Sequence, residues 1–168
     1  MKYPRARSGQ ALLEAALLLP FLFLFLFGTM ALGKVVYTYF ALQKALYSIA
    51  RMAGTAQGID LCNSADPILV GIENVVLTGT ADGQGPSAIS NLTNSDIQVR
   101  VERFDPVNNT LTLCDCSVAG CDINAGGLSP DFIVVSLPNG YTMAPTFPLF
   151  KVDAFPLRPQ IRIPFGGS

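Results

Sequence analysis

The chain opens with a long segment that is apolar on every side. Residues 11–32 are interrupted only by Glu14, Pro20, Gly28 and Thr29. A hydrocarbon core about 30 Å thick needs roughly 20 helical residues to cross it, so this segment is long enough to span a bilayer. A helix without a polar face is typical of a lipid environment. We therefore expect a transmembrane helix over about residues 11–32.

Beyond residue 32 the apolar residues keep a helical spacing but occupy one face only. They are Val35, Tyr39, Leu42, Leu46, Ile49 and Ala53. Steps of three and four residues are typical of an amphipathic helix. The first strong stop signals are Gly54 and Gly58. The pattern predicts one helix over residues 10–57, about 70 Å long at 1.5 Å per residue, whose second half packs on the following domain.

After residue 59 the pattern changes to short β-prone runs separated by turn residues. The strands that we expect cover residues 68–78, 97–104, 110–114, 132–137 and 160–163. Residues 105–109 read as a hairpin loop, and the prolines after residue 138 favour irregular chain at the sheet edges. The segment 59–168 is long enough for one small domain. The predicted fold class is α+β, a long N-terminal transmembrane helix that continues into a small, mainly antiparallel β domain.

The charges flanking the apolar segment indicate its orientation. Lys2, Arg5 and Arg7 precede it, and the first basic residue after it is Lys34. This excess places the N-terminus in the cytoplasm and residues 59–168 outside. A secretory signal peptide has an apolar region of only roughly 7 to 15 residues. The greater length here favours an uncleaved anchor, or a cut before the apolar segment, over cleavage after it.

The composition of the remaining chain argues against several functions. Residues 59–168 hold eleven acidic and five basic residues, a net charge of about −6, whereas nucleic-acid binding requires a basic surface. The chain has no histidine, the commonest general base, and no phosphate-binding loop or nucleophile elbow. We expect a non-enzymatic protein with no catalytic residue, no cofactor, no metal and no nucleic-acid partner.

Four cysteines, Cys62, Cys114, Cys116 and Cys121, follow the apolar segment. On the outer side of the membrane, disulfides are permitted. A bond between Cys114 and Cys116 would be strained, so we expect Cys121 to pair with one of these two and Cys62 with the other. The bridge to Cys62 would tie the end of the long helix to the β domain. A four-thiolate zinc site is the alternative, although the C-x-C-x4-C spacing departs from the usual two-residue pairing.

The start of the apolar segment carries a family resemblance. Residues 7–14 read Arg-Ser-Gly-Gln-Ala-Leu-Leu-Glu, and a Leu19-Pro20 step follows. This segment resembles the N-terminus of TadE-like proteins, the minor pilin-like components of the Flp/Tad type IVb pilus system. The resemblance implies a prepilin-type leader over residues 1–9, cut after Gly9 by a membrane aspartic peptidase, so that Gln10 starts the mature chain. Ala15 departs from the pattern, because type IVb pilin sites usually carry an aromatic residue there.

The resemblance also implies a location and partners. It suggests a minor pilin or pseudopilin that crosses the bacterial inner membrane once, with a cytoplasmic N-terminus and a periplasmic or extracellular C-terminal domain. The implied partners are other pilins, the Tad assembly platform and the prepilin-type peptidase. Two alternatives stay open: a major pilin or type II secretion pseudopilin, and a membrane-tethered extracytoplasmic binding domain.

The presence of Glu14 in the apolar segment has a physical explanation that is compatible with this resemblance. A carboxylate within a membrane helix costs roughly 2.5 to 3.5 kcal/mol on insertion scales. A cut after Gly9 would create an α-amino group on Gln10, about one helical turn away. That ammonium could neutralise the carboxylate within one chain or between neighbouring chains. In the alternative, Glu14 lies at the membrane interface with its carboxylate in water.

Overall fold

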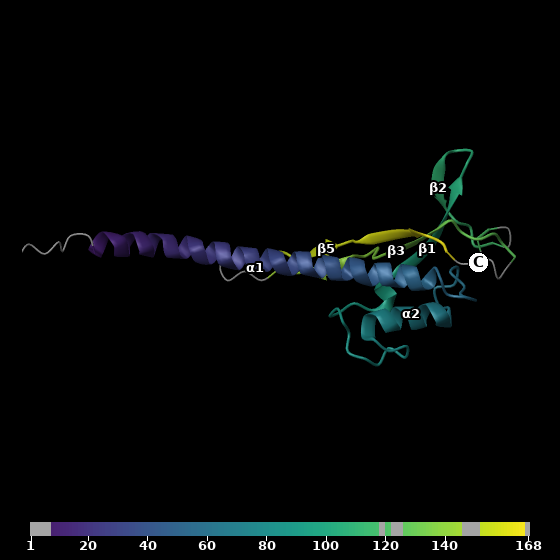
Figure 1. Ribbon diagram of the computed structural model, residues 1–168, viewed down its shortest axis with the longest axis horizontal. Helices are drawn as coiled ribbons and strands as arrows, with labels where there is room; N and C mark the ends of the chain where they lie inside the picture. Colours follow the sequence, from purple (N-terminus) through teal and green to yellow (C-terminus); the bar gives the residue numbers. More distant parts are fainter. Residues whose placement is uncertain (1–7, 118–119, 122–125, 146–151, 167–168) are drawn as a thin grey trace, which may run out of the picture. The chain divides into compact units, whose positions relative to one another are not determined.

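The computed structural model describes residues 8–117, 120–121, 126–145 and 152–166 (Figure 1). The chain divides into two units, one of residues 1–38 with 143–155 and the other of residues 39–142 with 156–168. The first unit contains the apolar part of the long helix. The second contains the rest of that helix, a shorter helix and the main sheet. The α+β class predicted from the sequence is confirmed.

The long helix α1 covers Ser8–Ala53 and continues through Pro20. In the first unit its side chains are almost all exposed, as Leu12 and Phe21 illustrate at 72% and 73%. The helix ends before the predicted boundary at residue 57. The amide of Gly54 makes the last helical hydrogen bond, to the Ala50 carbonyl at 2.8 Å, and Gly58 then adopts a positive φ of 71°. The earlier of the two glycine stops is therefore the one that ends the helix.

The second unit is built on a four-stranded antiparallel sheet in the order β2-β1-β3-β6. The strands are β1 (Gln98–Asp105), β2 (Thr110–Leu113), β3 (Phe132–Ser136) and β6 (Gln160–Pro164). All four match predicted strands within two residues. The expected hairpin loop also connects β1 to β2, where Asn109 has a positive φ of 53°. The Asn108 side chain donates to Asp105 at 2.6 Å and holds the pKa of that carboxyl below its usual range.

Residues 68–78 were predicted to form a strand, and this prediction is wrong. They lie in helix α2, Pro67–Thr78, which follows a turn that carries Cys62. Asp66 caps the helix by accepting hydrogen bonds from the amides of Ile68 and Leu69. Pro67 occupies the first turn, where its missing N–H costs nothing, and Gly79 closes the helix at φ 78°. The capping residues outweigh the β-branched composition that favoured a strand.

The segment after residue 138 is more regular than predicted. Strands β4 (Tyr141–Met143) and β5 (Phe155–Leu157) form a two-stranded sheet where irregular chain was expected. Proline does follow the edge preference, since Pro164 lies on β6, an outer strand of the main sheet. A short 3-10 turn, η1 (Asn94–Asp96), precedes β1.

The core of the second unit lies between α1, α2 and one face of the sheet. Figure 1 shows α2 alongside the second half of α1, and the buried residues agree with this view. The main contributors are Leu42, Leu46, Ile49 and Ala53 of α1, Leu69 and Leu77 of α2, and Val101, Ile133 and Val135 of the sheet. The last four residues of the helical stripe predicted beyond residue 32 therefore pack in the core of the second unit. On the other sheet face, Arg162 forms an ion pair with Glu102, Nε to Oε2, at 2.8 Å.

Candidate functional site: the start of the long helix

The residues predicted for processing and assembly lie in the first two turns of α1. Gly9 and Gln10 are exposed helical residues, and a Cβ placed on Gly9 would meet no atom within 4 Å. The Gln10 side-chain amide donates to Glu14 Oε1 at 3.3 Å, as the one-turn spacing of a helix allows. The structure thus brings Gln10 and Glu14 together on one face. Of the expected leader, residues 1–7 lie outside the described residues.

The surroundings of this site are apolar and exposed. Residues 9–53 form a helix that is long and apolar enough to cross a membrane. Its large side chains have little cover, with Leu13 and Leu17 exposed by 63% and 62%. In water such a surface would be unfavourable, whereas lipid or neighbouring helices would cover it. The helix fits a single-pass membrane protein.

The comparison with protein families bears on this same helix. Residues 9–51 match the family model of TadE-like protein. This confirms the resemblance predicted from the sequence. The TadE-like match begins at Gly9 and covers about a quarter of the chain, nearly all of α1. No curated protein and no solved structure matches the chain.

The TadE-like match concerns the long helix and does not extend to the domain that follows it. The match stops before Gly54, so α2 and the main sheet lie outside it. The TadE-like family is a structural, non-enzymatic family. The family and the apolar helix together are consistent with a protein of a Tad pilus.

The four cysteines form two disulfides, one from Cys62 to Cys116 and one from Cys114 to Cys121. The Cα atoms are 5.6 Å and 5.7 Å apart, within the usual range. This is one of the two pairings expected from the sequence. No free thiolate is left for the zinc alternative. The first bridge joins the turn before α2 to the segment that follows β2. The second closes a tight loop in which a Cβ on Gly120 would collide with the Asp115 carbonyl.

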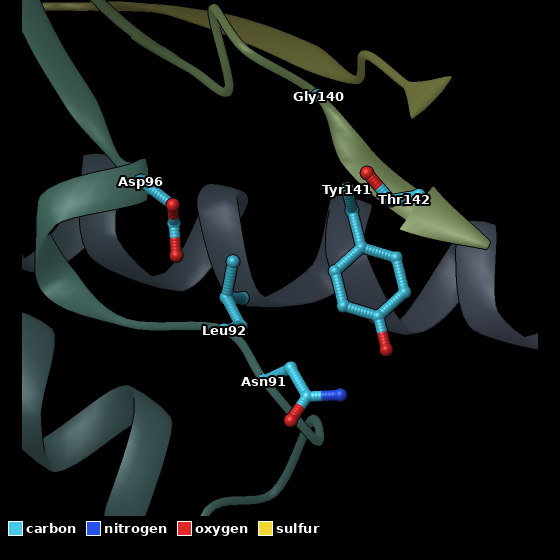
Figure 2. A pocket seen from close by; sticks show the side chains of 6 residues that line it. All are labelled: Asn91, Leu92, Asp96, Gly140, Tyr141 and Thr142. Carbon is cyan, nitrogen blue, oxygen red and sulfur yellow. The ribbon is translucent and has the colours of Figure 1, made fainter. Parts of the chain in front are cut away.

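A polar cavity of about 280 Å³ in the second unit was not predicted. It lies between the segment before β1, which supplies Asn91 and Asp96, and β4, which supplies Tyr141 (Figure 2). Both titratable side chains are already engaged. Asp96 accepts from the amide and hydroxyl of Thr93 at 2.9 and 2.7 Å, and the Tyr141 hydroxyl donates to the Ser90 carbonyl at 2.9 Å. We assign no chemistry to this cavity.

Little in the sequence indicates this cavity, because its walls lie far apart along the chain. The positive φ of Asn91, 60°, and of Gly140, 76°, mark the two bends that bring the walls together. Glycine and asparagine at such positions are the only local signal. The sequence does not show the pairing of β4 with β5, so this local signal does not predict that the two walls meet.

Proposed function

We propose that this protein is a minor pilin or pseudopilin of the Flp/Tad type IVb pilus system. The observation that carries the proposal is the TadE-like match over residues 9–51, which falls on an exposed apolar helix long enough to span a membrane. The helix anchors the protein in the inner membrane, and the second unit, with its disulfides, is displayed on the outer side. Disulfides are consistent with that compartment.

In the proposed mechanism, the prepilin-type peptidase cuts after Gly9 and Gln10 becomes the first mature residue. The new ammonium and the Glu14 carboxylate then lie one helical turn apart and offset the cost of placing Glu14 in lipid. The side-chain contact between Gln10 and Glu14 supports this geometry, because the carboxylate already reaches the residue that would carry the amine. An amine that instead meets a neighbour's Glu14 sets the two subunits in axial register.

Helix packing in the membrane supplies the remaining contacts with other pilins and with the Tad assembly platform. A Cβ placed on Gly28 or Gly33 would meet no atom within 4 Å, so both positions are open to a neighbouring helix. Small residues allow close approach of helix backbones in lipid. Assembly of this kind needs the helix itself, whereas a membrane-tethered binding domain needs only some anchor.

The N-terminal mass of the protein, purified from its native membrane with and without the prepilin-type peptidase, tests the proposal. We expect a chain that starts at Gln10 only when the peptidase is present. The Glu14→Gln variant should be processed normally but should be lost from sheared filaments, because it keeps the size of the side chain and removes its charge. A chain that starts at Met1 in both strains would contradict the proposal.

The alternatives make different predictions for two further measurements. An unrelated apolar helix in place of residues 11–32 should abolish pilus assembly here, whereas a tethered binding domain would keep its function. A major pilin would dominate sheared filament preparations, and a minor pilin or pseudopilin would be scarce there.

A further inference from the structure

Glu73 on α2 is a buried acidic residue that has no partner among the residues the structure describes. Only 5% of its surface is exposed, and it makes no hydrogen bond or ion pair within the described part of the chain. Burying a carboxylate without compensation is unfavourable by several kcal/mol. An apolar residue would serve the α2 packing better, because the neighbouring core positions are Leu69, Ile72 and Leu77. The packing of α2 therefore does not explain this glutamate.

The Glu73 side chain lines a cavity of about 350 Å³ between α2 and the segment that leads into β1. Its walls are apolar on the α2 side, at Leu69 and Val70, and at Ile97. Ser64 and Gln98, which are exposed, add polar groups to the lining. Neither side chain makes a hydrogen bond within the described residues. The cavity thus combines apolar walls, free hydrogen-bonding groups and one unpaired carboxyl group.

This combination fits an organic cation better than a metal ion. Divalent metals take several carboxylate, histidine or cysteine ligands, and no group of three such residues occurs within the described ranges. An alkylammonium group has an apolar stem for the walls and three N–H donors for the carboxylate and its polar neighbours. Burial raises the pKa of Glu73 to about 7, and a bound cation would favour the ionised form.

We infer that this cavity binds a primary alkylammonium group, such as a lysine side chain, with Glu73 as its counter-ion. Ser64 and Gln98 accept the remaining N–H groups, and Leu69, Val70 and Ile97 contact the stem. The inference does not depend on the proposed pilin function, since it rests on α2 and β1, which lie outside the TadE-like match.

A titration of the full chain in nanodiscs, followed by the ¹H–¹⁵N NMR spectrum, tests this inference. n-Butylammonium is the probe, and n-butanol is a neutral probe of nearly the same shape. At pH 7.5 we expect n-butylammonium to shift the amide signals of residues 69–73 and 97–99, with an affinity at least about tenfold above that of n-butanol. The Glu73→Gln variant should lose this preference, while Asp153→Asn, which removes an exposed acid elsewhere, should keep it.

Three outcomes would overturn the inference: no shift with n-butylammonium, equal shifts with the two probes, or an unchanged preference in Glu73→Gln. The comparison of the two probes on the unaltered protein is decisive even if the variant fails to fold. The spectrum of Glu73→Gln without a probe shows whether its fold is retained.

Discussion

At the residue scale, two glutamates lie in opposite settings. Glu14 is exposed on the apolar helix and accepts a hydrogen bond from Gln10, so groups outside the chain can reach it. Glu73 is buried, without a hydrogen bond among the described residues, and burial raises its pKa to about 7. The carboxylate of Glu14 is accessible, whereas that of Glu73 reduces the stability of its own domain whenever it is ionised.

This difference predicts a pH-dependent stability. The pKa of Glu73 rises from 4.5 to about 7 on folding, so the folded state binds more protons between these values. Its contribution is fully present below pH 4.5 and is lost as the pH rises through 7. The Glu73→Gln variant should therefore match the unaltered protein near pH 4 and exceed its free energy of unfolding by on the order of 3 kcal/mol at pH 8.

Denaturant unfolding of both proteins at pH 4, 6 and 8 measures this difference. Asp153→Asn serves as the control, because that side chain is exposed and its removal should leave the profile unchanged. A constant gap between Glu73→Gln and the unaltered protein at all three pH values would contradict the prediction.

At the element scale, α2 shows how end signals decide between a helix and a strand. Residues 68–78 are rich in valine, isoleucine and leucine, which a strand also favours. The Asp66 carboxylate accepts from the amides of Ile68 at 2.8 Å and Leu69 at 3.2 Å, and Gly79 supplies the left-handed closing residue. These bonds satisfy helix ends that would otherwise be left without partners.

Replacing the cap should weaken α2 and with it the second unit. We expect Asp66→Ala to lower the free energy of unfolding by about 1 to 2 kcal/mol, because two helix amides lose their acceptor. Asp66→Asn keeps an acceptor oxygen and should cost less than half as much. Chemical denaturation of both variants measures the effect, and equal losses for alanine and asparagine would show that the cap does not act through its hydrogen bonds.

At the scale of the whole molecule, the two disulfides constrain the chain to different extents. The Cys62–Cys116 bridge joins residues 54 positions apart, whereas Cys114–Cys121 joins residues 7 positions apart. The first bridge connects the turn before α2 to the segment that follows β2, and the second acts within a single loop. Closing a longer loop removes more entropy from the unfolded chain.

The loop lengths predict unequal losses of stability. The double variant Cys62→Ala with Cys116→Ala should lower the free energy of unfolding by about 4 kcal/mol, and Cys114→Ala with Cys121→Ala by about 2 kcal/mol. Denaturant unfolding under non-reducing conditions compares the two variants. The reverse order would mean that local packing around Cys121, which is only 4% exposed, outweighs the loop entropy.

The sequence by itself determined the features that depend on neighbouring residues along the chain. The long apolar segment predicted the N-terminal helix, and the helical stripe predicted the packing of Leu42, Leu46 and Ile49. The residues around Asn109 predicted the hairpin. The TadE-like resemblance was also local, since it rests on residues 7–20. Hydrophobic periodicity and turn chemistry act over a few residues, so a sequence displays them directly.

The tertiary structure decided what depends on distant residues. The choice of Cys116 rather than Cys114 as the partner of Cys62 follows from the positions of α2 and of the segment after β2. The burial of Glu73 follows from the approach of residues 97–99 to α2, and the pairing of β4 with β5 required two segments with no strong strand pattern. Each of these contacts joins residues that the sequence keeps apart, and only the folded chain brings them within reach of one another.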